Sequence, residues 1–123
     1  EQNRIYLHAG FANMHGPQAE FYPNTVYWDR TLWELVKAMD KSLSPEDEFY
    51  PDRLKLFKEI YIGHAPTTRL GITKPMHLAN VWNIDTGAAF RGPISILDVD
   101  SKEVWQSDPV HELYPDEPGR NKD

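Results

Sequence analysis

The chain contains no cysteine, which excludes disulfide bonds, thiolate metal sites and cysteine nucleophiles. No apolar run approaches the roughly 18 residues needed to cross a bilayer, and the first residues lack the basic and then apolar pattern of a secretory signal. Basic residues are few, since 13 Lys and Arg stand against 19 Asp and Glu, for a net charge of -6. Nucleic acids and anionic membranes are bound through clustered Lys and Arg, so neither partner is expected. These absences favour a protein of the cytoplasm.

The composition that remains is that of a folded protein. Of the 123 residues, 40% are hydrophobic and 26% are charged, which predicts one domain with its own core. The chain begins on Glu1 rather than methionine, and a strand-like segment follows almost at once, so we expect a piece of a longer protein. We place the folded part at residues 1–107. Residues 108–123 are proline-rich and charged, which predicts a tail that lies over the surface and then frays.

Five short segments are typical of β-strands. The first is "RIYL", where Ile5 and Leu7 alternate with Tyr6 and His8. The segment "EIYI" (59–62) follows a predicted short helix at 51–58. Three more β-prone segments lie at 81–85, 93–99 and 102–107, the last two joined by a short turn that is typical of a hairpin. The segments between them, 11–26 and 65–80, are predicted to be loops.

The segment "YWDRTLWELVKAMD" is the clearest helix. Its apolar residues recur at the spacing i, i+3, i+4 and i+7, which makes one apolar stripe: Leu32, Leu35, Val36 and Met39. Asp29 or Thr31 is expected to cap its start, and Thr31 with Glu34 has the spacing of a capping box. Strands combined with one firm amphipathic helix predict an α/β fold.

Two histidines follow strand-like segments directly. His8 stands in "LHAG" and His64 in "GHAP", so each imidazole is expected at the carboxyl end of a strand, where active-site loops gather in α/β proteins. Gly63 is expected to turn the chain there. Because imidazole is a common ligand of divalent metals, two converging histidines are a candidate metal site. The alternative is that each histidine is a hydrogen-bonded turn residue.

Arg30 is the third candidate. It stands at the start of the predicted helix between Trp28 and Trp33, where a guanidinium and the helix dipole would both favour a phosphate. The alternative is a solvated surface arginine beside the cap.

Four segments together resemble the carboxyl-terminal half of calcineurin-like metallophosphoesterases. They are "RIYLHAG", "YWDR", "YIGHAPT" and "NVWNIDTGAAFRGPISILDVD", and they occur in the family's order and approximate spacing. The nearest likeness is to bacterial serine/threonine phosphatases and diadenosine tetraphosphatases. The resemblance extends from Arg4 to about Ser107, and GHAP in place of the usual GHTP is a mild departure.

The resemblance implies roles for five residues. His8 and His64 match histidines that bind the second of two metal ions in the family, where manganese, iron, zinc or nickel is used. Arg30 matches an arginine that contacts the substrate phosphate. Asp85 and Thr86, in "DTGA", match a segment that borders the active site and helps to pack it. The implied activity is hydrolysis of a phosphate ester by a metal-activated hydroxide.

The family's other metal motifs, D-x-H, G-D-x-x-D-R-G and G-N-H-[ED], do not occur in this sequence. They supply the bridging aspartate, most ligands of the first metal and the catalytic histidine. We therefore expect the chain to be a fragment with little or no phosphatase activity alone. The implied fold is about half of a four-layer α-β-β-α sandwich, in which two mixed sheets pack face to face. Without its amino-terminal half, such a fold would expose sheet edges, which favours a dimer or a domain swap.

A second interpretation belongs to a different class. Aromatic residues are dense in "EFYPNTVYWDRTLW" and "EDEFYP", and Trp, Tyr and Arg dominate the energetics of protein interfaces. The chain is then a non-catalytic protein-interaction module. The alternative for each of these rings is a place in the core.

Overall fold

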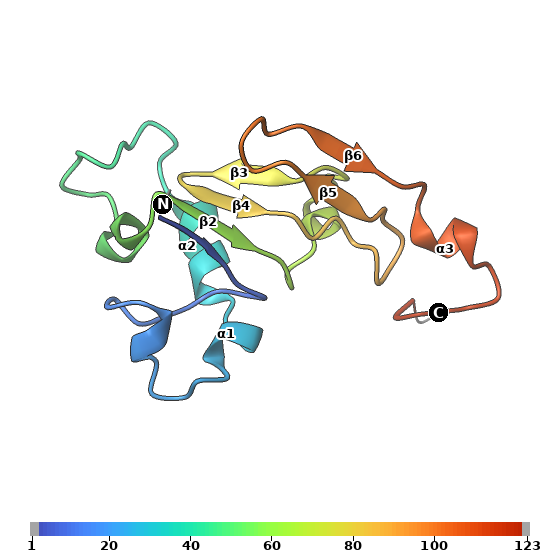
Figure 1. Ribbon diagram of the computed structural model, residues 1–123, viewed down its shortest axis with the longest axis horizontal. Coiled ribbons are helices and arrows are strands. Elements are labelled where there is room, and N and C mark those ends of the chain that lie inside the picture. Colours follow the sequence, from blue (N-terminus) through green and yellow to red (C-terminus); the bar gives the residue numbers. More distant parts are fainter. Residues whose placement is uncertain (1–2, 122–123) are drawn as a thin grey trace. The chain divides into compact units, whose positions relative to one another are not determined.

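A mixed four-stranded sheet is the larger of the two sheets in the structure. The computed structural model describes residues 3–121 and shows the strands in the order β1-β2-β4-β3 (Figure 1). Their bounds are Arg4–Tyr6 for β1, Glu59–Ile62 for β2, Val81–Asn83 for β4 and Met76–Leu78 for β3. β1 and β2 run parallel, with Arg4 opposite Glu59 and Tyr6 opposite Tyr61. Because the two strands are parallel and in register, the segments that follow them leave the sheet side by side, at the carboxyl ends of the strands.

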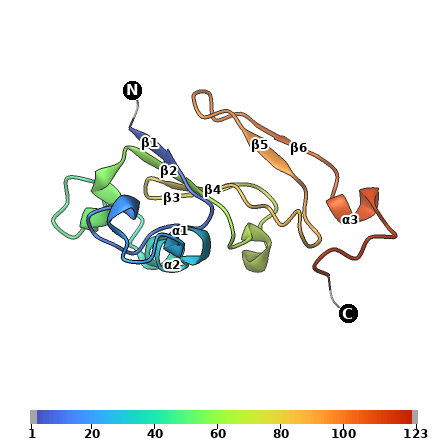
Figure 2. The same cartoon turned by 60° about the horizontal axis from the view of Figure 1, so that its bottom comes forward.

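Helix α2 (Thr31–Ala38) covers one face of this sheet, as Figure 2 shows. Its buried side chains are Leu32, Trp33 and Val36. The predicted stripe is therefore rotated toward Trp33, because Leu35 and Met39 are only half-buried. The capping box is wrong: Thr31 lies inside the first turn, and the carboxylate of Asp29 accepts hydrogen bonds from the backbone N–H groups of Thr31 (3.2 Å) and Leu32 (3.1 Å).

The chain divides into two compact units, which are described separately. The first contains residues up to 65 and 77–82, and the second contains residues 66–76 and those from 83 onward. Among residues 3–121, the buried hydrophobic side chains other than proline all belong to the first unit. They include Phe11, Leu54, Ile60, Ile62 and Val81. The hydrophobic core that supports the candidate histidines is thus contained in one unit.

The second unit is built on the hairpin of β5 (Ser95–Leu97) and β6 (Val104–Gln106). The strands are antiparallel, with Ile96 opposite Trp105, as the sequence predicts for these segments. Asp98 closes the hairpin turn by accepting hydrogen bonds at its carboxylate from the N–H groups of Asp100 and Ser101. The buried side chains of this unit are polar or belong to proline: Thr67, Asn83, Thr86, Pro66 and Pro93. Hydrogen-bonded turns rather than a large apolar core therefore hold it together.

Several short elements fall wholly or partly where the sequence predicted loops or a tail. They are β3, the single-turn helices α1 (Thr25–Trp28) and α3 (Val110–Leu113), and the 3-10 turns Pro17–Ala19 and Thr67–Leu70. The predicted helix at 51–58 is a shorter 3-10 helix, Asp52–Leu56. The segment predicted as a tail is tied to its own unit, because Arg120 N–H donates to the carbonyl of Ala89 and Asn121 Nδ2 donates to that of Phe90. The predicted fraying of 122–123 lies outside the described residues.

None of the helices that residues 3–121 form has the length and apolar character needed to span a membrane.

Candidate functional site

The structure brings His8 and His64 together at the carboxyl ends of β1 and β2. The parallel pairing continues past the strands, since Leu7 N–H donates to Tyr61 O (2.9 Å) and Gly63 N–H donates to His8 O (2.8 Å). As a result, His8 Nε2 lies 3.2 Å from His64 Nδ1. His8 is exposed and His64 is half-buried, so the pair is open to solvent. The two histidines therefore meet because β1 and β2, which are far apart in sequence, pair in this register.

The backbone at His64 is unusual. Its φ angle is 68°, in the left-handed region, and Ala65 N–H donates to Gly63 O at 2.8 Å across it. This is a three-residue γ-turn with positive φ at its centre, a strained conformation for a residue with a side chain. Gly63 is part of this turn, since its carbonyl closes it, but the residue with positive φ is His64 rather than the glycine. Strain of this kind, of about 1–3 kcal/mol, is concentrated at functional sites.

The segment around Trp28 packs against the two histidine motifs. The Trp28 ring meets that of His64 edge-on, with centroids 5.6 Å apart. Ala9 N–H donates to the carbonyl of Val26, which lies in α1 together with Trp28. A Cβ atom at Gly10 would lie 2.7 Å from Asp29 Oδ2. The glycine of "HAG" is thus required for the close approach of the carboxylate that caps α2.

Arg30 occupies the predicted position at the start of α2. It is the residue that precedes the first helical turn, and it is exposed. Within residues 3–121, its guanidinium makes no hydrogen bond and no ion pair. The side chain is therefore available for a ligand, as a solvated surface arginine would also be.

Arg53 has a positioning role that the sequence did not reveal. Its Nη1 donates to the carbonyl of Phe11 (3.0 Å), which follows "HAG", and to Thr31 Oγ1 (3.1 Å) at the start of α2. The guanidinium thereby ties the loop after His8 to the helix that carries Arg30. Local sequence offers no signal for this, because the acceptors lie 42 and 22 residues away.

Asp85 and Thr86 belong to the second unit, where they build a tight turn. Asp85 Oδ1 accepts a hydrogen bond from Gly87 N–H (3.0 Å), and its carbonyl accepts one from Thr67 N–H (2.8 Å). Thr86 is buried, and its hydroxyl donates to Pro93 O at 2.8 Å. A Cβ atom at Gly92 would lie 1.8 Å from Thr86 O. Packing within this turn accounts for the small residues of "DTGA" and for the glycine at position 92.

The two imidazoles suit one divalent metal ion. Two nitrogen ligands at about 2.1 Å from an ion lie about 3.0 to 3.4 Å apart for bond angles between the octahedral and tetrahedral values. The observed 3.2 Å falls in this range. Residues 3–121 contain no cluster of three or more His, Asp or Glu side chains placed to share an ion. Alone, the pair could supply no more than two ligands to an ion. A hydrogen bond between two neutral imidazoles has the same separation.

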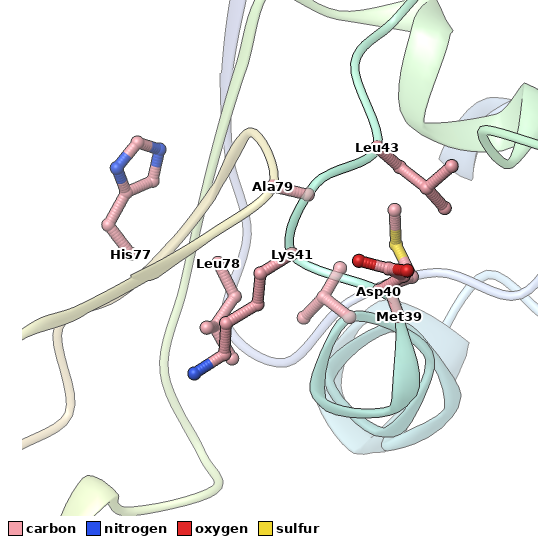
Figure 3. Close-up of a pocket in the computed structure, with 8 residues that line it drawn as sticks. Met39, Asp40, Lys41, Leu43, His77, Leu78 and Ala79 are labelled. Atoms are coloured by element: carbon pink, nitrogen blue, oxygen red, sulfur yellow. The ribbon is translucent and has the colours of Figure 1, made fainter. Parts of the chain in front are cut away.

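One pocket of about 220 Å³ lies at the far end of α2, and it contains none of the predicted site residues (Figure 3). It is lined by Val36, Met39, Asp40, Lys41, Leu43, His77, Leu78 and Ala79. Figure 3 shows the His77 ring directed away from Asp40. Hydrogen bonds from the N–H and the hydroxyl of Ser42 lower the pKa of Asp40, so this carboxylate is occupied by its own turn. The pocket offers no converging polar groups.

No protein-family model and no curated protein matches this chain.

Proposed function

We propose that the chain is the carboxyl-terminal portion of a metal-dependent phosphoesterase of the serine/threonine-phosphatase type. The observation that carries the proposal is the 3.2 Å separation of His8 Nε2 and His64 Nδ1, at the ends of two parallel strands. Two imidazole nitrogens at this separation, open to solvent, are the proposed partial site for manganese, iron, zinc or nickel. A metal bound there would act as a Lewis acid on a phosphoryl oxygen and would generate hydroxide at neutral pH.

The chain's own residues hold this partial site in place. The γ-turn at His64 fixes the direction of one imidazole, and the β1–β2 register fixes the other. Trp28, edge-on to His64, restricts the rotation of that ring. These contacts preorganise two ligands without any contribution from metal binding, which reduces the entropy lost when an ion binds.

Arg30 is the proposed phosphate-binding residue. Its guanidinium is exposed and makes no contact that would occupy it within the described residues. A planar guanidinium donates hydrogen bonds to two oxygens of a phosphate at once. Asp85 and Thr86 are proposed only to shape the turn in which they lie.

The chain alone is expected to be inactive. Two-metal phosphoester hydrolysis requires ligands for a second ion, and no further cluster of metal ligands exists among residues 3–121. The remaining ligands are proposed to come from an amino-terminal half of the same domain, which would complete a four-layer sandwich. The phosphorylated substrate would bind where the two halves meet.

The test is to express the chain together with the residues that precede Glu1 in the full-length protein. This longer protein should hydrolyse an aryl phosphate in the presence of Mn²⁺, and His64→Asn should remove most of the activity. His15→Asn is the matched control, since His15 is an exposed histidine of the same unit. A longer protein that is inactive with manganese, or a His64→Asn variant that keeps its activity, would refute the proposal.

The second candidate is a non-catalytic protein-interaction module. It is favoured by four large aromatic side chains that are strongly exposed: Phe21, Tyr22, Trp28 and Phe49. Exposed aromatic residues are enriched at interaction sites. Titration with Zn²⁺ separates the two candidates, because a module of this kind gives no saturable shift of the His8 and His64 ring resonances.

A further inference from the structure

Four aromatic rings, one from each strand, form a continuous stack across the sheet of the first unit. They are Tyr6 on β1, Tyr61 on β2, Trp82 on β4 and His77 on β3. The successive centroids lie 5.1, 6.5 and 4.1 Å apart, and the ring planes are tilted by 18°, 15° and 6°. The order of the rings is the order of the strands. We call these four rings the aromatic ladder.

The ladder ends on an exposed ring at an edge strand. In the part of the chain that the structure describes, β1 is the last strand of the sheet (Figures 1 and 2). Tyr61 is only 3% exposed, whereas Tyr6 is 58% exposed. One face of the Tyr6 ring stacks on Tyr61, so its other face is directed toward the open edge.

The hydrogen-bond pattern places the backbone of Tyr6 at that edge. Asn3, just before β1, accepts at its carbonyl from Lys58 N–H, and Leu7, just after β1, donates its N–H to Tyr61 O, so the odd-numbered residues that flank the strand bond inward toward β2. Backbone groups alternate in direction along a strand. The N–H and C=O of Tyr6 are therefore directed away from β2, where another strand could pair with them.

We infer that this edge pairs with β1 of a second copy of the chain, antiparallel and centred on Tyr6. In that arrangement the two Tyr6 residues exchange both backbone hydrogen bonds about a two-fold axis. The two Tyr6 rings then lie on the same face at neighbouring positions, so the ladder continues through the axis from one copy into the other. Aromatic pairs at such cross-strand positions stabilise antiparallel sheets.

Charge at this edge permits the approach. The nearest charged side chain on β1, Arg4, is neutralised by Glu59 at 2.5 Å, and both side chains are largely buried. The net charge of -6 still repels two copies at long range. Because salt screens that repulsion, association should be stronger at 300 mM NaCl than at 20 mM. The inference does not depend on metal binding.

Sedimentation equilibrium of the chain between about 10 μM and 1 mM tests the inference, since a pairing of three-residue strands is expected to dissociate in this range. A monomer–dimer equilibrium is expected for the natural chain. Tyr6→Lys should raise the dissociation constant at least tenfold, because it removes the ring and places a charge at the edge. Tyr6→Phe, which keeps the ring, should dimerise as the natural chain does.

Tyr114→Lys is the matched control, because Tyr114 is 62% exposed and lies in the second unit. It should leave the dissociation constant unchanged. Amide shifts that depend on concentration should be confined to β1 and its neighbours in the natural chain. A chain that stays monomeric to 1 mM would overturn the inference, as would a dimer that Tyr6→Lys leaves intact. Circular dichroism of each variant establishes that the fold is retained.

Discussion

His8 Nε2 lies 3.2 Å from His64 Nδ1, although 56 residues separate the two histidines along the chain. The pair exists because β1 and β2 are parallel and in register, so both imidazoles follow the carboxyl ends of neighbouring strands. Solvent reaches the pair, and no third metal ligand accompanies it within residues 3–121. The two imidazoles are therefore the proposed two-ligand site, and the fold sets the distance between them.

The first prediction is that the chain binds one Zn²⁺ ion through the two histidines. Either His8→Asn or His64→Asn should weaken the affinity at least tenfold, because a single imidazole is a poor site for a divalent ion. His15→Asn should leave the affinity unchanged. Calorimetric titration gives the affinities, and NMR of the imidazole rings identifies the ligands. Equal affinity in all three variants would assign the metal to another part of the chain.

The second prediction concerns Gly10. A Cβ atom there would lie 2.7 Å from Asp29 Oδ2 and 3.1 Å from Leu32 Cβ. Gly10→Ala should therefore lower the free energy of unfolding by about 2–3 kcal/mol, as overpacking does. Gly71→Ala is the control, because Gly71 has a φ of 74° and no atom lies within 4 Å of the position that a Cβ atom would take. It should cost only about 1 kcal/mol. Urea denaturation measures both values, and a smaller loss at Gly10 than at Gly71 would contradict the prediction.

The third prediction concerns the strain at His64. Because its φ is 68°, His64→Gly should raise the free energy of unfolding by about 1 kcal/mol while it removes a proposed metal ligand. His8→Gly is the control, since His8 has no positive φ. It should lower the free energy of unfolding by about 0.5–1 kcal/mol. Urea denaturation again gives both values. Loss of stability in both variants would mean that the turn at His64 is not strained.

The fourth prediction concerns acid. Hydrogen bonds from the backbone N–H groups of Ser101 and Asp100 hold the pKa of Asp98 below its ordinary value of 3.8. The Asp98 carboxylate therefore binds a proton less readily in the folded hairpin than in the unfolded chain. The contribution of the ionised Asp98 carboxylate to stability is complete above pH 3.8, the pKa in the unfolded chain. It is lost as the pH falls through the lower pKa of the folded chain. Amide exchange at Asp100 and Ser101, corrected for the intrinsic rate, should accelerate over that range.

Asp98→Asn should make this exchange independent of pH in the same range. Asp116→Asn is the control, because Asp116 is an exposed carboxylate of the same unit. It should leave the acceleration in place. Acceleration that persists in Asp98→Asn would place its origin in a different carboxylate.

Local sequence signals predicted the longer elements well. The segment 59–62 is a strand with the bounds expected, and the apolar spacing located α2. Strand β3 was missed because it has three residues and lies between Pro75 and Asn80, which are typical of turns. The predicted strands at 81–85, 93–99 and 102–107 are each shorter in the structure, because hydrogen bonding ends before the β-prone composition does.

The candidate site was predictable in its members and unpredictable in its geometry. A histidine after each of two strands can be recognised in the sequence, but their convergence requires that the strands be parallel neighbours, which only the tertiary fold decides. The γ-turn at His64 leaves no compositional signal, since histidine has no preference for positive φ comparable to that of glycine. The links made by Arg53 and the aromatic ladder join residues that are distant in sequence, so no local pattern marks them.

The parallel pairing of β1 with β2 also sets when the histidine pair can form. Register partners such as Arg4 and Glu59 are 55 residues apart, and closing a loop of that length costs about 3.5 kcal/mol of chain entropy beyond the constant term. During synthesis, His64 is added 56 residues after His8. Contacts of such long range form slowly, so the approach of the two imidazoles is a late event in folding, and metal affinity would report the arrival of the chain at its native topology.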